Sequence, residues 1–457
     1  MGEYFGTDGF RGEVNVTLTA KHAYEIGRYI GRFVAMQKGY ERGKVVIGKD
    51  PRRSSYMYEY ALSAGLTASG ADAYLLHVTT TPSVSYITRT EGFSCGVMIS
   101  ASHNPYTDNG IKIFDENGGK ADEELINGVE QHLKNVEKGV ENLPYAKGGC
   151  VGKTVDFRAG RNRYIGYLIS LSKSSFSDLK IGLDCAEGSA FFIAKSVFDA
   201  LGAITVPIHV TPNGENINLR CGSTCPEELC ALVKEKGLDM GFAFDGDGDR
   251  CICVDERGQI RDGDCVLYAS AKHGLCERHQ KTVVATAMSN GALAHALKAI
   301  GVETAYSKVG DRYVFEKMEE LGAMLGGEQS GHIIFKRHAN TGDGILTAIK
   351  MTELAVEKEC KFSELFDGLT MYPQSQKNVT VGHKKEILKS VKLESVLYEC
   401  EELLKKYQGR LFVRPSGTEE KIRILTECTS GTLCEETAKR IEDTILALDG
   451  QGDGAKR

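Results

Sequence analysis

The chain has 457 residues and a formal net charge of −6, from 56 Lys and Arg against 62 Asp and Glu. This near balance argues against a general nucleic-acid binder, which carries a strong basic excess, and no apolar run approaches the ~18 residues of a membrane span. At roughly 100–200 residues per domain the length predicts about three or four domains, and because the first residues lack the basic and apolar regions of a signal peptide, we expect a cytoplasmic protein.

Short β-branched runs alternate with segments of helical spacing over most of the chain. Apolar residues recur at 23, 26, 30 and 33, which predicts a helix with Thr19 as its N-cap. Leu293, Leu297 and Ile300 predict another. Alternation of this kind is typical of α/β layers with parallel sheets. The predicted strands are 44–48, 74–76, 95–99, 180–183, 240–244 and 282–285.

After about residue 370 the pattern changes. Strands are predicted at 378–381, 410–413 and 422–425 around two helical stretches, which indicates a smaller α+β unit. The glycine-rich tail from Gly450 to Gly454 is expected to fray. Polar or glycine-rich junctions at 148–149, 172–175, 255–258 and 366–373 lead to predicted domains at 1–155, 156–257, 258–369 and 370–457.

The 14 cysteines indicate reduced and mostly buried thiols, because this is a long chain with no visible leader. Cys221, Cys225 and Cys230 form the densest group, but no matched C-x2-C pairs support a zinc site. Cys251 and Cys253 alternate on a predicted strand and are assigned to the core.

The first candidate site is the segment from Ile99 to Pro105, which follows a buried strand. Catalytic groups in α/β sheets gather at the carboxyl ends of strands. Ser102, with His103 beside it, could be a nucleophile or a phosphoryl carrier. A polar turn that bonds its own backbone is the alternative, and the segment alone does not exclude it. The G-x-S-x-G pattern of an α/β-hydrolase is absent.

The second candidate site places Asp245, Asp247 and Asp249 at alternate positions with glycines between them. Three such carboxylates are costly unless a cation neutralises them, and hard oxygen ligands suit Mg²⁺ or Ca²⁺. An EF-hand is an alternative because Glu256 falls at loop position 12, but Arg250 stands at position 6, where Gly is required. We therefore expect a Mg²⁺ site rather than an EF-hand or a solvated acidic turn.

The third candidate site runs from Gly326 to His332, where glycines surround an acid, an amide, a hydroxyl and an imidazole. The carboxylate of Glu328 can accept hydrogen bonds from sugar hydroxyls, and the hydroxyl of Ser330 can both donate and accept. A loop pressed against a hydroxyl-rich ligand would have this composition. A simple glycine-rich turn would have it equally well.

The fourth candidate site runs from Arg414 to Arg423. Arginine offers a bidentate fork, Ser416 and Thr418 offer hydroxyls, and Gly417 exposes a backbone N–H. Together these groups could form an oxyanion or phosphate cradle. A turn between two strands with surface charges is an equally good interpretation of this segment alone.

Together and in this order, the four motifs resemble those of the α-D-phosphohexomutase superfamily. With the segment from Tyr4 to Gly12 at the start, the match runs to about residue 425. Each motif alone is moderately specific, whereas the whole set in order is highly specific. Within the superfamily the likeness is greatest to the bacterial phosphoglucosamine mutases, and it is carried by the segments 5–9, 221–224, 308–314 and 327–332.

The resemblance implies four domains around a central cleft, three of them α/β domains of similar topology and the fourth a small phosphate-binding α+β domain. It implies that Ser102 is carried as phosphoserine, and that Asp245, Asp247 and Asp249 hold Mg²⁺ together with an oxygen of that phosphate. The other implied site residues are Arg11, His103 and Lys112 near the transferring phosphoryl group, Glu328 and Ser330 on sugar hydroxyls, and Arg414, Ser416, Gly417, Thr418 and Arg423 on the phosphate that does not react.

The activity implied by the resemblance is the interconversion of glucosamine 6-phosphate and glucosamine 1-phosphate through a phosphoserine and a bisphosphate intermediate. This reaction would supply amino-sugar nucleotides and cell-wall precursors. The implied partners are a sugar monophosphate and the bisphosphate, with no nucleic acid and no membrane, and the chain would be a monomer or a homodimer. The alternatives are a phosphoglucomutase or phosphomannomutase, and a catalytically silent sugar-phosphate sensor on the same fold.

The chain departs from the superfamily pattern at three positions. Glu420 stands where a proline usually follows the Thr-Glu pair of the last motif, and an extra carboxylate there would weaken anion binding unless it points outward. Glu187 replaces a usual asparagine, and Cys225 replaces a His or Asp. Neither of the last two touches the implied chemistry.

Overall fold

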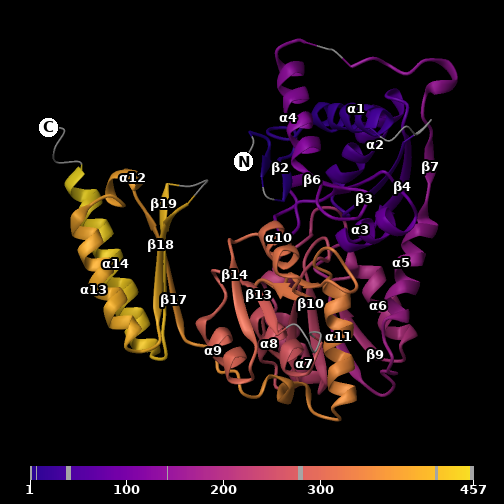
Figure 1. The fold of residues 1–457 in the computed structure, drawn as a ribbon. Coiled ribbons are helices and arrows are strands. Elements are labelled where there is room, and N and C mark those ends of the chain that lie inside the picture. The colour runs from indigo at the N-terminus through magenta and orange to yellow at the C-terminus, as the bar shows by residue number, and fades with distance from the viewer. Residues whose placement is uncertain are drawn as a thin grey trace. The chain divides into compact units, whose positions relative to one another are not determined.

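The computed structural model describes residues 3–6, 8–37, 43–140, 143–275, 281–416 and 420–452. The chain divides into two compact units (Figure 1). The first unit comprises residues 1–288 and 301–367, and the second comprises residues 289–300 and 368–457. The predicted domain boundaries at 155/156, 257/258 and 369/370 stay predictions.

The first sheet of the larger unit has seven strands in the order β1-β2-β6-β5-β3-β4-β7. The four strands β5, β3, β4 and β7 run parallel, and β6 returns antiparallel to β5. Thr19 Oγ1 accepts from the His22 amide at the start of α1, which confirms the predicted N-cap. The bounds are β1 Phe5–Gly6, β2 Gly9–Glu13, α1 Ala20–Gln37, β3 Lys44–Lys49, α2 Arg53–Ala68, β4 Asp72–Val78, α3 Thr81–Thr90, β5 Cys95–Ile99, β6 Asp108–Phe114, α4 Glu123–Glu137 and β7 Thr154–Asp156.

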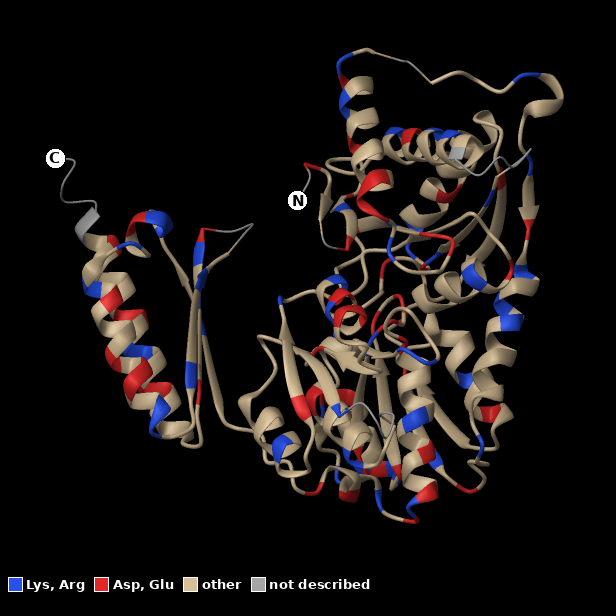
Figure 2. Ribbon diagram, viewed as in Figure 1, with Lys and Arg blue, Asp and Glu red and all other residues tan. Residues whose placement is uncertain are grey.

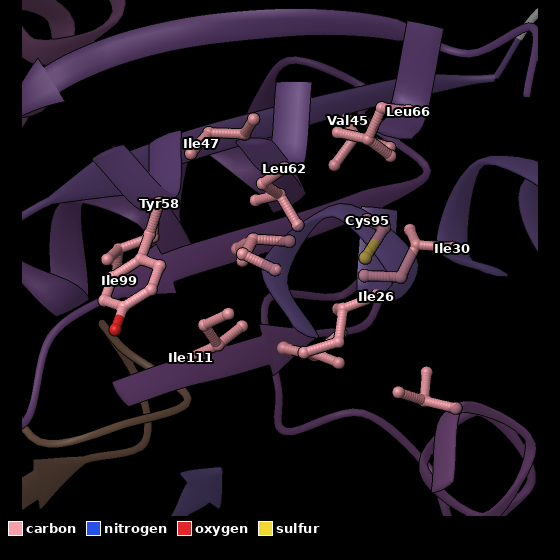
Figure 3. Close-up of a cluster of buried hydrophobic side chains, with 14 of the residues drawn as sticks. Ile26, Ile30, Val45, Ile47, Tyr58, Leu62, Leu66, Cys95, Ile99 and Ile111 are labelled. Atoms are coloured by element: carbon pink, nitrogen blue, oxygen red, sulfur yellow. The ribbon is translucent and has the colours of Figure 1, made fainter. Parts of the chain in front are cut away.

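The core of this first layer forms where α1 and α2 cover the sheet. Ile26 and Ile30 of α1 and Leu62 of α2 pack with strand residues in one buried cluster (Figure 3). The two helices approach closely because Gly65 faces α1: a Cβ there would lie 2.0 Å from the carbonyl oxygen of Tyr24. This packing fixes β3 and β5, and therefore the loops that leave their carboxyl ends.

The second sheet has the order β12-β11-β10-β8-β9, and the third has the order β14-β13-β15-β16. The turn predicted at 255–258 is confirmed, and it joins β11 to β12 as a hairpin turn within the second sheet. The bounds are η1 Gly148–Cys150, α5 Arg158–Ser170, β8 Lys180–Asp184, α6 Ala190–Ala200, β9 Ile204–Ile208, η2 Gly222–Thr224, α7 Glu227–Lys236, β10 Met240–Phe244, β11 Cys251–Asp255, β12 Ile260–Arg261, α8 Gly263–Lys272, β13 Thr282–Thr286, α9 Gly291–Ala299, β14 Glu303–Ser307, α10 Asp311–Leu321, β15 Leu325–Gly327, β16 Ile333–Phe335, α11 Gly344–Glu357 and η3 Phe362–Phe366.

The three sheets share one local pattern. In each, a strand with a parallel neighbour is followed by an antiparallel strand: β5 by β6, β10 by β11 and β15 by β16. The connections are residues 100–107, 245–250 and 328–332, which carry the first three motifs. This recurrence confirms the expectation of three α/β domains of similar topology.

The smaller unit has a three-stranded antiparallel sheet in the order β17-β19-β18. Helices α13 and α14 pack on this sheet, and residues of both signs of charge are interspersed along them (Figures 1 and 2). Helix α14 continues to Gly452, so the expectation of a frayed tail is wrong for residues 450–452. The bounds are β17 Gln374–Thr380, α12 Lys384–Ile387, α13 Val391–Lys405, β18 Arg410–Pro415, β19 Lys421–Glu427 and α14 Gly431–Gly452.

The cysteines occur in both units of the chain. In the described part of the chain the thirteen cysteines form no disulfide, and most of them are buried as expected, including Cys251 and Cys253 on β11. Within the same residues, no helix combines the length and apolar character needed to cross a membrane.

Candidate active site

Ser102 lies at the start of the β5–β6 connection, fully buried and in the left-handed region with φ of 52°. Non-glycine residues rarely adopt this conformation unless the surroundings impose it. Its Oγ donates to Asp245 Oδ2 at 2.6 Å, and His103 Nδ1 lies 3.4 Å from the same Oγ. The first two motifs are therefore brought together across two sheets.

The three aspartates of the β10–β11 connection converge. Asp245, Asp247 and Asp249 are buried, and each offers one carboxylate oxygen such that all three oxygens lie within 4.8 Å of one another. Oδ1 of Asp247 and Oδ1 of Asp249 are buried without a hydrogen-bond partner among the described residues. Burying a carboxylate oxygen without a partner costs free energy of folding. A hard divalent cation would satisfy these oxygens, so the donor set fits such an ion.

Burial, followed by the charges of Asp249 and Asp247, raises the pKa of Asp245 well above its usual range. Burial by itself would also raise the pKa of Asp249. The positive charges of Lys112, His332 and Arg250 outweigh this effect and hold the pKa of Asp249 below its usual range. Burial and the like charges of its neighbours therefore disfavour the ionised form of Asp245, and a nearby positive charge would stabilise it. A bound cation would supply that charge.

Lys112 of β6 faces this cluster from the first sheet. Its Nζ lies 2.8 Å from Asp247 Oδ2, 3.3 Å from Asp249 Oδ2 and 3.1 Å from Asp8 Oδ2. Burial by itself would lower the pKa of Lys112. The negative charges of these carboxylates, with Asp247 the strongest, hold that pKa well above its usual range. Arg11 of β2 donates to Asp8 and also, at 3.4 Å, to the carbonyl of Ala101. Two fixed cations therefore stand beside the Ser102 loop.

His103 is a neutral imidazole in this site. Burial, followed by the positive charges of Arg250 and Arg11, lowers its pKa to about 4. At neutral pH the imidazole is therefore uncharged, and one of its ring nitrogens can accept a hydrogen bond. His103 is predicted to lie near the transferring phosphoryl group. Its Nδ1 lies 3.4 Å from Ser102 Oγ, within hydrogen-bond distance of that hydroxyl.

A pocket of about 400 Å³ opens beside these groups within the larger unit. Glu328 lines it, and Glu328 Oε1 accepts from the Gly310 amide at 3.0 Å. Ser330, the other predicted sugar contact, is not among the lining residues, and its Oγ is buried with no partner in the described residues. The lining residues are Tyr4, Gly6, Asp8, Gly9, Arg11, Asp249, Arg250, Val309, Gly310, Asp311, Glu328 and His332.

The fourth motif lies in the smaller unit, at the ends of β18 and β19. Arg414 and Arg423 are exposed and stand directly opposite each other in the antiparallel register. Like charges at opposed positions repel, which favours an anion there. Ser416 is buried, and the predicted Gly417 and Thr418 lie outside the described residues. Glu420, the unusual carboxylate, is mostly exposed and pairs with Lys384 at 3.1 Å.

Several pocket and cluster residues received no role from the motifs. Thr81 Oγ1 donates to Asp247, and Lys120 pairs with both Asp8 and Asp311. Asp8 and Asp311 lie in the segments 5–9 and 308–314, which carry the family resemblance. Thr81 and Lys120 carry no local signal, because their partners are distant in sequence.

The EF-hand alternative is wrong, because the strands β10 and β11 flank the aspartates where an EF-hand has helices. Both carboxylate oxygens of Glu256 accept from Ser363, and Glu256 does not belong to the aspartate cluster.

Comparison with known proteins assigns the four segments to one family. Family models described as phosphoglucomutase/phosphomannomutase match residues 2–139 (alpha/beta/alpha domain I), 162–258 (domain II), 262–372 (domain III) and 377–444 (C-terminal domain). These matches cover most of the chain. They place the four motifs in four successive domains of that family.

Comparisons with individual proteins give the same family assignment. The chain is 51% identical over 448 residues to a phosphoglucosamine mutase of Lachnospira eligens, covering 97% of this chain and 98% of that one. It is 45% identical over 449 residues to a phosphoglucosamine mutase of Geobacillus kaustophilus, with coverage of 97% and 98%. A solved phosphoglucomutase/phosphomannomutase family protein of Burkholderia thailandensis superposes with a TM-score of 0.79 at 25% identity, covering 98% of each chain. The chain therefore belongs to the α-D-phosphohexomutase superfamily and, within it, to the phosphoglucosamine mutase family of isomerases.

Proposed function

We propose that this enzyme interconverts glucosamine 6-phosphate and glucosamine 1-phosphate through a phosphorylated Ser102 and a sugar bisphosphate, in the supply of amino-sugar nucleotides and cell-wall precursors. The observation that carries the proposal is the contact between Ser102 Oγ and Asp245 in a buried carboxylate cluster. A hydroxyl held at such a cluster, beside Lys112 and Arg11, is placed for phosphoryl transfer, which depends mainly on positioning and charge neutralisation.

In the proposed reaction, a hydroxyl of the sugar monophosphate attacks the phosphorus of phospho-Ser102. The bond between phosphorus and Ser102 Oγ breaks, and the proton of the attacking hydroxyl passes to Ser102 through the neutral imidazole of His103. The bisphosphate then turns around, and Ser102 Oγ attacks its other phosphorus. The bond between that phosphorus and the sugar oxygen breaks, and the Ser102 proton passes through His103 to this oxygen. The products are phospho-Ser102 and the isomeric sugar monophosphate. Lys112 and Arg11 would stabilise the transferring oxygens.

Asp245, Asp247 and Asp249 would hold Mg²⁺, with phospho-Ser102 as a further oxygen ligand. The bound ion would neutralise charge on the transferring oxygens. Glu328 and Ser330 would contact sugar hydroxyls. Contact by Ser330 requires its hydroxyl to reach the pocket, which it does not line in this structure.

Mass spectrometry of the intact protein and of its peptides tests the carrier directly. We expect a phosphate on Ser102 in protein that has been incubated with a hexose bisphosphate, and its loss on incubation with an excess of sugar monophosphate. A protein that turns over substrate with no phosphate on Ser102 would overturn the proposal.

Replacing Arg414 with Ala is expected to raise KM for sugar phosphate by about 10–100-fold, because a charge-assisted hydrogen bond is worth roughly 1.5–3 kcal/mol. The unreacting phosphate is bound in the ground and transition states alike, so kcat should change less. Steady-state kinetics measure both constants. Arg440→Ala, which removes an exposed arginine paired with Glu399 on the same unit, is the control and should change neither. A large fall in kcat at constant KM would place Arg414 at the reacting phosphate.

The preferred substrate is expected to be the glucosamine phosphate, with measurable side activity on glucose phosphate. At C2 the two sugars differ by an ammonium against a hydroxyl and are nearly isosteric, so shape cannot separate them and the preference should be partial. Comparing kcat/KM for glucosamine, glucose and mannose phosphates tests this. A higher value for glucose or mannose phosphate would reassign the substrate while leaving the chemistry standing.

A further inference from the structure

The buried guanidinium of Arg52 donates hydrogen bonds to several backbone carbonyls of the Ser102 loop. Arg52 follows β3 and is fully buried. It donates to the carbonyl oxygens of Ser102 at 3.0 Å and Asn104 at 2.9 Å, and to those of Pro105 and Asp108. Three carbonyls of this loop and the first carbonyl of β6 therefore converge on a single side chain. A planar fork of five N–H donors can do this, and a lysine cannot.

Arg52 is itself held by Asp50. Arg52 Nε donates to Asp50 Oδ2 at 2.8 Å, and the same oxygen accepts from Ser100 Oγ at 2.7 Å. Ser100 Oγ in turn accepts from the backbone amide of Ser102 at 2.9 Å. The amide and the carbonyl of Ser102 are thus both tied, through different partners, to one carboxylate at the end of β3.

Asn218, which lies between β9 and β10 of the second sheet, binds two of the same carbonyls. Its Nδ2 donates to the carbonyl of Ser102 at 2.9 Å and to that of Asn104 at 3.1 Å, so each of these two oxygens accepts from both Arg52 and Asn218. Asn218 also has a left-handed backbone, with φ of 59°. A Cβ on Gly246 would lie 2.5 Å from the Ser102 carbonyl and 2.8 Å from Asn218 Nδ2. The aspartate loop therefore packs directly against this contact.

We propose that Arg52 and Asn218, the carbonyl clamp, are positioning residues that hold Ser102 in its left-handed conformation and set its Oγ against Asp245. The inference rests on the proposed role of Ser102 as phosphoryl carrier. Asn218 precedes the aspartate loop in the same domain, so the clamp links the loop that carries the phosphoryl group to the loop that carries the carboxylates. Neither clamp residue lines the pocket, so the clamp acts through Ser102 and not on the sugar.

Two substitutions of Asn218 test the proposal. Asn218→Gly removes both hydrogen bonds while suiting the left-handed backbone. Asn218→Asp keeps the size, but an ionised carboxylate accepts only and would face two carbonyl oxygens. A displacement of a reacting atom by about 1 Å costs on the order of 10²-fold in rate. We therefore expect kcat to fall about 10–100-fold in Asn218→Gly and further in Asn218→Asp, with KM within about twofold of the wild type.

Arg53→Met is the matched control. Arg53 is the next residue to Arg52 and bridges the same two domains through Glu215, but both side chains are largely exposed. Its kcat and KM should equal those of the wild type. Thermal unfolding of all three variants separates positioning from folding, because a positioning role lowers kcat while Tm stays close to that of the wild type.

The outcomes distinguish this inference from the proposed function. If wild-type protein carries no phosphate on Ser102, the proposed carrier is wrong and the clamp has no catalytic group to position. If wild type is phosphorylated and active while Asn218→Gly and Asn218→Asp keep wild-type kcat, the clamp is overturned and the carrier stands. A fall in kcat matched by a large fall in Tm in both variants would mark a structural role and also overturn it.

Discussion

Replacing Ser102 with Ala is expected to abolish turnover, with a fall in kcat on the order of 10⁴-fold or more, as is typical when a covalent nucleophile is removed. No other hydroxyl among the described residues donates to Asp245. The fold should survive, because Ala is smaller than Ser and the backbone at this position stays tied to Ser100 and Arg52. A modest loss of stability should follow from the lost hydrogen bond to Asp245.

A coupled assay for the product, thermal unfolding and intact mass together check this result. Ser170→Ala is a matched control, because that hydroxyl is exposed and donates only to the carbonyl of Tyr167 in its own helix. The control should keep full activity and the phosphate on Ser102. Near-wild-type rates in Ser102→Ala would show that the phosphoryl group is carried elsewhere.

Replacing Asp247 with Asn is expected to lower kcat by about 10²–10³-fold, because it removes one of three charged ligands without changing their shape. Asp247 also pairs with Lys112 and accepts from Thr81, so the substitution leaves the Lys112 cation with one carboxylate fewer. Activity of the wild type should disappear with EDTA and return with added Mg²⁺, and the variant should need more Mg²⁺ for half-maximal activity.

Asp239→Asn serves as the comparison for this prediction. Asp239 directly precedes β10, at the end opposite to the aspartate loop, where it is exposed and accepts from the Lys180 amide. Its variant should retain wild-type kcat and the same response to Mg²⁺. Wild-type enzyme that is indifferent both to EDTA and to Mg²⁺ would remove the metal site from the proposed function.

The sequence determined the strands and the motif loops because both leave local signals. Strands buried on both faces, such as β5 and β10, read as continuous apolar runs bounded by polar or glycine-rich loops. The residues after those runs could therefore be assigned to the carboxyl ends of strands, where Ser102 and Asp245 are found. The expectation of a frayed tail from Gly450 was wrong at that residue for the same local reason. Glycine weakens a helix, but α14 packs on its sheet and continues past Gly450 to Gly452.

Only the tertiary structure decided which of these groups meet. Ser102 and Asp245 are 143 positions apart, Lys112 and Asp247 are 135 apart, and Asn218 lies 116 positions from Ser102. Contacts at such separations depend on how whole sheets pack, and no local propensity or spacing encodes them. Arg52 and Asn218 are the clearest case, because an Arg in a polar turn and an Asn in a loop look like ordinary surface residues in sequence. They are recognised only when the buried carbonyls of a distant loop, which must be hydrogen-bonded, are found to converge on them.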